Sequence, residues 1–170
     1  SVISESGISK DLIDEIIMGQ VLTGGSGQNP ARQTSMLSNL PEKVSALSIN
    51  QVCGSGLRAV ISGYQSIKLG EAKNVISGGQ ENMSLAPHSI FYRDNKKISE
   101  KHLVDTMIND GLIDAFNNYH MGVTAENISR KFDISRIEQD EYAFNSQKKT
   151  ELAIINNKFE DEIIKINHEN

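Results

Sequence analysis

One stretch constrains the fold more than any other, and it reads Ser48-Ile-Asn-Gln-Val-Cys53-Gly-Ser-Gly-Leu57. Residues 45–52 mix β-branched and apolar side chains over a length that is typical of a strand. From Leu57 onward, apolar residues recur at helical spacing up to a stop at Gly70. The pattern therefore predicts a buried strand, a sharp turn and a helix, with Cys53, the only cysteine of the chain, at the turn.

Cys53 has two interpretations, which residue chemistry alone leaves about evenly balanced. Free cysteine is among the most buried residue types, so Cys53 could be a small core residue. Alternatively it is a reactive thiol, because Gly54 and Gly56 lack a Cβ and let the backbone turn tightly and a ligand approach closely. A thiol at a helix N-terminus faces the positive end of the helix dipole, which favours the nucleophilic thiolate. Hydrolases present a nucleophilic serine on the same strand–turn–helix geometry.

The region around Cys53 alternates strands and helices. We expect strands at 15–21, 45–52 and 74–77, with helices at 31–39 and 57–67 between them. Asn29-Pro30 is a favourable helix start, since an N-capping side chain precedes a proline at the first helical position. Short crossovers of this kind imply parallel strands in an α/β sheet, with Cys53 at the carboxyl end of its strand, where such sheets bind ligands.

The second half of the chain has weaker patterns. Residues 85–102 lack periodicity, and their basic side chains could form a patch for the phosphates of a ligand, although a solvated loop is the simpler interpretation. These basic residues are Arg93, Lys96, Lys97 and Lys101. Ser135-Arg-Ile-Glu138 is a capping box and predicts a long helix to about Asn157 with a partly buried stripe that includes Ile137 and Leu152. Further elements are expected as short helices at 103–108 and 124–132 and a strand at 162–166.

Composition excludes several classes of protein. The 170 residues are 38% hydrophobic and 23% charged, and the net charge of −5 comes from interspersed signs, which argues against a nucleic-acid-binding surface. One cysteine forms no internal disulfide, and no apolar run approaches the ~20 residues of a membrane span. We therefore expect a cytoplasmic protein with no membrane or nucleic-acid partner, and a site without metal, because no His/Cys/Asp cluster has ligand spacing.

Residues 49–60 resemble the acyl-enzyme signature of the thiolases, and four further stretches resemble that family in the same order. These stretches are Ile17-Met-Gly-Gln-Val21, Gly27-Gln-Asn-Pro-Ala-Arg32, Gly78-Gly-Gln-Glu-Asn-Met-Ser84 and His120-Met-Gly-Val-Thr-Ala-Glu-Asn127. Within the family the chain is most similar to the acetoacetyl-CoA thiolases, since residues 83–88 and 119–122 look like the short-chain type.

The resemblance implies a fold and a domain organisation. The fold is a thiolase-like α/β fold, with a mostly parallel sheet, helices on both faces and the start of an inserted loop domain. Residues 1–83 would belong to the N-terminal α/β domain, without its first strand and first helix. Residues 84–170 would belong to an incomplete loop domain, whose segment 85–102 resembles the loop that helps to assemble a homotetramer. The chain is thus expected to be a fragment, covering about the N-terminal half of such an enzyme.

The resemblance also implies a reaction, the Claisen condensation of two acetyl-CoA molecules to acetoacetyl-CoA and coenzyme A, or the reverse thiolysis. Cys53 would carry the acetyl group and its backbone N–H would stabilise the oxyanion, with coenzyme A thioesters as substrates and no cofactor. His120 and Met121 would line the acyl and pantetheine pocket, and Leu112 would touch the pantetheine arm. Ordinary core packing is the alternative for Leu112 and Met121, and a satisfied buried histidine is the alternative for His120.

The family places three further catalytic groups in its C-terminal half: a histidine, an asparagine-bound water and a second cysteine. None is assigned here, because none of the four histidines of this chain occurs in the motif of the catalytic histidine. These histidines are His88, His102, His120 and His168. Two alternatives stay open, a longer-chain 3-ketoacyl-CoA thiolase and a non-catalytic thiolase half. Expressed alone, the 170 residues are expected to be inactive and poorly soluble, because apolar faces would be exposed.

Overall fold

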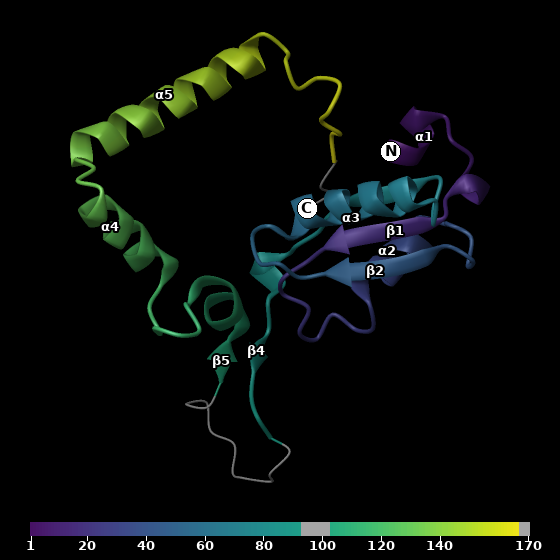
Figure 1. Cartoon of the computed structure of the whole chain (residues 1–170), viewed down its shortest axis with the longest axis horizontal. Helices are drawn as coiled ribbons and strands as arrows, with labels where there is room; N and C mark the ends of the chain where they lie inside the picture. The colour runs from purple at the N-terminus through teal and green to yellow at the C-terminus, as the bar shows by residue number, and fades with distance from the viewer. Residues whose placement is uncertain (93–102, 167–170) are drawn as a thin grey trace. The chain divides into compact units, whose positions relative to one another are not determined.

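The computed structural model describes residues 1–92 and 103–166, which fall into two compact units. The first unit spans Val2–Ala115 and the second begins at Phe116 (Figure 1). The predicted boundary between residues 83 and 84 concerns an inserted loop domain, and it stays a prediction.

The first unit is built on a three-stranded parallel sheet. Its strands are β1 (Glu15–Gly19), β2 (Ser45–Ile49) and β3 (Val75–Gly79), in the order β2-β1-β3. In the register of the sheet, Ile17 of β1 lies beside Leu47 and Ser77. Ile16 and Ile17 are both buried although they point to opposite faces, so the central strand is covered on both sides. The predicted parallel α/β arrangement is confirmed.

Two helices cover the two faces of this sheet. The backbone N–H of Ala31, in α2 (Pro30–Leu37), donates to Ser48 Oγ of β2 over 3.1 Å. Gly63, in α3 (Ser55–Leu69), lies so close to Ser77 of β3 that an added Cβ would overlap the Ser77 hydroxyl. Ser48 pairs with Met18 and Ser77 with Ile17, so the two contacts lie on opposite faces (Figure 1).

Local capping explains where these helices begin and end. Asn29 Oδ1 accepts the Arg32 N–H at the start of α2, as the Asn-Pro pair predicts. Gly70 ends α3 with a φ of 76°, a left-handed conformation that favours glycine. The core beside β1 is a cluster of buried aliphatic residues formed by Ile13, Ile16, Leu40 and Val44.

The remainder of the first unit consists of short elements. They are α1 (Val2–Ser6), η1 (Lys10–Leu12), η2 (Met83–Leu85), β4 (His88–Ser89), β5 (Val104–Asp105) and the π-helix η4 (Met107–Leu112). The predicted loop at 85–102 contains a short strand, because β4 pairs antiparallel with β5. The four basic residues that could form a phosphate patch lie outside the described residues.

The predicted helix at 103–108 is wrong, because Val104 and Asp105 form a strand. Their backbone pairs with β4, a partner that is distant in sequence, and Thr106 Oγ1 donates to the Pro87 carbonyl over 2.6 Å. The Asp105 carboxylate then accepts the Met107 N–H and starts the π-helix, which continues through Gly111.

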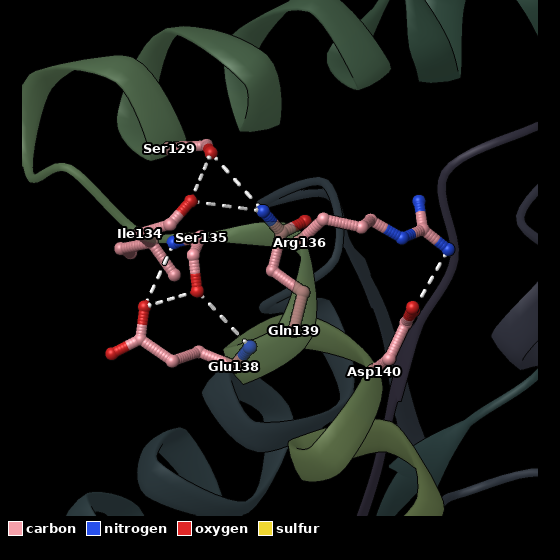
Figure 2. A network of polar contacts seen from close by, with 7 residues as sticks. All are labelled: Ser129, Ile134, Ser135, Arg136, Glu138, Gln139 and Asp140. Carbon is pink, nitrogen blue, oxygen red and sulfur yellow. Dashed lines mark hydrogen bonds and ion pairs between the residues drawn. The ribbon is translucent and has the colours of Figure 1, made fainter.

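The second unit contains α4 (Met121–Lys131) and α5 (Arg136–Ile155). The predicted capping box is confirmed: Glu138 N–H donates to Ser135 Oγ, and Glu138 Oε2 accepts the Ser135 N–H over 2.8 Å (Figure 2). Gln139 Nε2 donates to Ser129 Oγ and to the Ile134 carbonyl, which joins α5 to the end of α4 (Figure 2).

Two predictions for the second unit are wrong. The expected stripe on α5 is not buried, since Ile137 is 70% exposed and Leu152 is 49% exposed. Residues 162–166 form no strand, because the described residues of this unit contain no strand with which their backbone could pair. Within 1–92 and 103–166, no helix is both long and apolar enough to cross a membrane.

The Asp14 carboxylate, just before β1, forms hydrogen bonds with the segment just before β3. These bonds lead us to expect that the stability of the fold depends on pH. Its carboxylate accepts the backbone N–H groups of Asn74 (3.0 Å) and Lys73 (2.7 Å), and these bonds hold the Asp14 pKa below its usual value. A lowered carboxylate pKa stabilises the fold above the pKa of the unfolded chain, about 3.9, and the contribution is lost as the pH falls through the folded pKa.

We expect Asp14→Asn to lower the midpoint of urea unfolding of the intact protein at pH 6. Between pH 5 and pH 3 we expect the midpoint of the variant to fall less than that of the unaltered protein, because the variant has no carboxylate to protonate at this position. Asp11→Asn is the matched control, because no backbone N–H donates to the exposed Asp11 carboxylate among the described residues. Equal pH profiles for the unaltered protein and Asp14→Asn would contradict the assignment.

Candidate active site

Cys53 lies in a turn between the carboxyl end of β2 and the start of α3, as the sequence pattern predicts. The strand ends at Ile49, earlier than expected, and residues 50–54 form the connection, here called the Cys53 turn. Cys53 is exposed, so its interpretation as a small buried core residue is wrong. An exposed thiol at this edge of a parallel sheet is accessible to a ligand.

The unusual backbone conformation of the Cys53 turn lies at Val52 and not at a glycine. Val52 has a φ of 48°, in the left-handed region. Gly54 has an ordinary right-handed conformation, although a Cβ there would lie 3.3 Å from the Gln51 carbonyl oxygen. Gly56 has open space where a Cβ would be, which leaves room beside the sulfur-bearing turn.

Hydrogen bonds within the Cys53 turn leave one donor unused. Asn50 Oδ1 accepts the Val52 N–H over 2.9 Å, and the Gly54 N–H donates to the Gln51 carbonyl over 3.0 Å. No turn or cap hydrogen bond among the described residues uses the Cys53 N–H, and Gln51 and Cys53 form an isolated parallel bridge. An exposed thiol beside such an N–H can take up an acyl group and stabilise the oxyanion that forms on it.

Gly19, the last residue of β1, lets α3 begin directly against the sheet. A Cβ at this position would lie 2.6 Å from Gly56 N and 2.7 Å from the Ser55 carbonyl oxygen. Both of these are backbone atoms at the start of α3, so no side-chain movement could make room. The absence of a side chain at Gly19 therefore sets the position of the Cys53 turn relative to the sheet.

Side-chain amides form hydrogen bonds between the carboxyl ends of β1 and β3. Sequence reasoning did not identify these hydrogen bonds. Thr34 Oγ1 donates to Gln80 Oε1, and Gln80 Nε2 donates to Gln20 Oε1 over 2.9 Å. The Glu81 carboxylate accepts the N–H groups of the loop after β1, at 2.8 Å from Val21 N. The partners come from segments far apart in sequence, so no local motif indicates them.

Leu112 is half-buried at the end of η4 and belongs to the same unit as Cys53. Its neighbour Gly111 approaches Leu22, since a Cβ at Gly111 would lie 3.9 Å from Leu22 Cδ2. Leu22 follows β1, so η4 lies near the carboxyl end of that strand. This placement is compatible with a pocket role for Leu112, which stays a prediction.

His120 and Met121 belong to the second unit and stand at the start of α4. His120 Nδ1 accepts the Gly122 N–H over 3.0 Å, so the imidazole is the N-cap of the helix. The cap explains why α4 begins before the expected Thr124. His120 is exposed, so its interpretation as a satisfied buried histidine is wrong, while the pocket roles of His120 and Met121 stay predictions. No group of three or more His, Cys, Asp or Glu side chains able to hold a metal occurs in the described ranges.

Comparison with known proteins identifies the family. A family model described as the N-terminal domain of thiolase matches residues 1–170. An acetyl-CoA acetyltransferase from Rhizobium meliloti is 50% identical over 96% of this chain, and one from Paracoccus denitrificans is 51% identical over 98%. A crystal structure of a thiolase from Ascaris suum in complex with coenzyme A has a TM-score of 0.89 and 35% identity, over 96% of this chain and 43% of its own.

The chain belongs to the thiolase family, and it matches the N-terminal domain of that family. Its α/β fold is the thiolase fold, as the sequence motifs indicate. The chain spans 42% of the length of each of these two curated relatives.

Proposed function

We propose that the intact protein is an acetyl-CoA acetyltransferase that condenses two acetyl-CoA molecules to acetoacetyl-CoA and catalyses the reverse thiolysis. The observation that carries the proposal is the exposed Cys53 in a strand–turn–helix of a thiolase N-terminal domain. Its own N–H lies beside the thiol and is used by no turn or cap hydrogen bond among the described residues. Relatives named as acetyl-CoA acetyltransferases, about half identical over almost the whole chain, support the choice of acetyl thioesters.

In the first step, the Cys53 thiolate attacks the carbonyl carbon of acetyl-CoA. A sulfur–carbon bond forms, negative charge moves to the carbonyl oxygen, and the Cys53 N–H donates to that oxyanion. The oxyanion collapses, the bond to the coenzyme A sulfur breaks, and coenzyme A leaves as a thiolate that takes up a proton. In the second step, another acetyl-CoA loses a proton at its α-carbon and the resulting carbanion attacks acetyl-Cys53, which frees the thiolate again. The covalent intermediate divides one difficult reaction into two easier ones.

Three side chains are proposed to contact the substrate. Leu112 is proposed to touch the pantetheine arm, and its half-buried position near the carboxyl end of β1 supports this. His120 and Met121 are proposed to line the acyl and pantetheine pocket, which rests on their place in the family motif. A homotetramer and a cytoplasmic location stay predictions of the resemblance.

The proposal is tested by trapping the acetyl-enzyme. We expect the intact protein, mixed with acetyl-CoA alone and quenched in acid, to gain one acetyl group in the peptide that contains Cys53. Blocking the thiol with iodoacetamide before the addition of acetyl-CoA is the control, and it is expected to prevent the mass shift. Absence of acetylation at Cys53 in a protein that catalyses thiolysis would refute the assigned nucleophile.

A further inference from the structure

Val52 is the only β-branched residue with a left-handed backbone conformation among the described residues. Its φ of 48° is shared by no other β-branched residue, because the remaining non-glycine residues at positive φ are asparagines and an aspartate. Short polar side chains tolerate this region, whereas a β-branched residue is strongly disfavoured there. The Val52 side chain is 48% exposed, so burial does not impose the conformation. Other interactions must therefore hold it.

Ser55, the first residue of α3, supplies those interactions. The Val52 carbonyl oxygen accepts two hydrogen bonds from this one residue, from Ser55 N at 3.1 Å and from Ser55 Oγ at 2.6 Å. Ser55 Oγ also accepts the Gln51 N–H over 2.8 Å. The hydroxyl thus bridges an N–H and a C=O on the two sides of the turn, and Ser55 itself is only 4% exposed against Gly19.

The bond to Val52 has a consequence for Cys53. The Val52 C=O and the Cys53 N–H belong to one planar peptide unit and point in opposite directions. Fixing the carbonyl toward Ser55 therefore fixes the direction of the Cys53 N–H away from it. We propose that Ser55 is a positioning residue for acyl transfer, whose hydroxyl directs the Cys53 N–H toward the oxyanion. This inference rests on the proposed function.

Two reactions of the same thiol separate this role from a general effect on the fold. Acetylation by acetyl-CoA passes through an oxyanion and needs the directed N–H. Alkylation by iodoacetamide occurs by displacement of iodide at carbon and forms no oxyanion. A change that only misdirects the Cys53 N–H slows acetylation and leaves alkylation nearly unchanged, whereas a general disturbance of the turn alters both rates.

The experiment compares Ser55→Ala with Ser35→Ala in the intact protein. Ser35 is a matched control, since it is fully buried and its Oγ has no hydrogen-bond partner among the described residues. For Ser55→Ala we expect acetylation of Cys53 at saturating acetyl-CoA to slow by about tenfold or more, with KM within about twofold. Its alkylation rate is expected to stay within about threefold of the unaltered protein. Ser35→Ala is expected to change neither rate.

Two results would overturn the inference while leaving the proposed function intact. One is a Ser55→Ala variant that is acetylated as fast as Ser35→Ala. The other is a parallel fall of acetylation and alkylation, which would assign Ser55 a purely structural role. Failure of the unaltered protein to be acetylated at Cys53 is a different result, and it would remove the proposed function together with this inference.

Discussion

Replacing Cys53 by serine is expected to lower the thiolysis rate of the intact protein by at least about a thousandfold, with little effect on the free energy of unfolding. The rate falls because a serine hydroxyl is not ionised near neutral pH and is a poor nucleophile without an adjacent base. The fold is retained because Cys53 is exposed and the turn is held by the hydrogen bonds of Asn50 and Ser55, not by the thiol.

Steady-state thiolysis of acetoacetyl-CoA and urea unfolding, measured on one preparation, check both parts of this prediction. Met36→Leu is a matched control, since it removes the sulfur of another partly exposed side chain of the same unit, on α2. We expect that control to keep full activity. A Cys53→Ser variant with normal turnover would refute the nucleophile, and a variant with a strongly lowered unfolding midpoint would show that the thiol also supports the fold.

The sequence predicts those elements whose cause is local. Asn29-Pro30 and Ser135–Glu138 fix the starts of α2 and α5, because each cap satisfies backbone donors only a few residues away. The alternation of strands and helices before residue 80 predicts a parallel sheet, because connections of that length return the chain to the same edge. The position of Cys53 at the end of β2 follows from the same pattern.

The elements that sequence reasoning missed depend on partners distant in the chain. Val104 and Asp105 form a strand only because β4 supplies a pairing edge. Residues 162–166 form none because no strand among the described residues of their unit offers such an edge. The function of Ser55 also could not be predicted. It depends on the left-handed conformation of Val52, which valine disfavours and which only the assembled turn imposes.

Gly19→Ala is expected to lower the free energy of unfolding by about 3 kcal/mol and to remove most of the acyl-transfer activity, although Gly19 contributes no side chain to the site. The added methyl group would overlap the backbone of Ser55 and Gly56, at 2.7 Å from the Ser55 carbonyl oxygen and 2.6 Å from Gly56 N. These are backbone atoms, so no change of side-chain rotamer can relieve the overlap, and α3 must move away from β1. Its first residue carries the hydroxyl that holds Val52, and the Cys53 turn must move with it.

Gly56→Ala separates this steric effect from the general cost of adding a methyl group. A Cβ at Gly56 has open space and lies within α3, where alanine is favoured over glycine by about 0.5–1 kcal/mol, so this variant is expected to unfold at a higher urea concentration. If Gly19→Ala were as stable as Gly56→Ala, the contact between β1 and α3 would not fix the helix. If Gly19→Ala were destabilised but fully active below its unfolding transition, the turn would hold its geometry without support from the sheet. Only a joint loss of stability and of Cys53 acetylation fits a turn that is positioned by the close approach of α3 to Gly19.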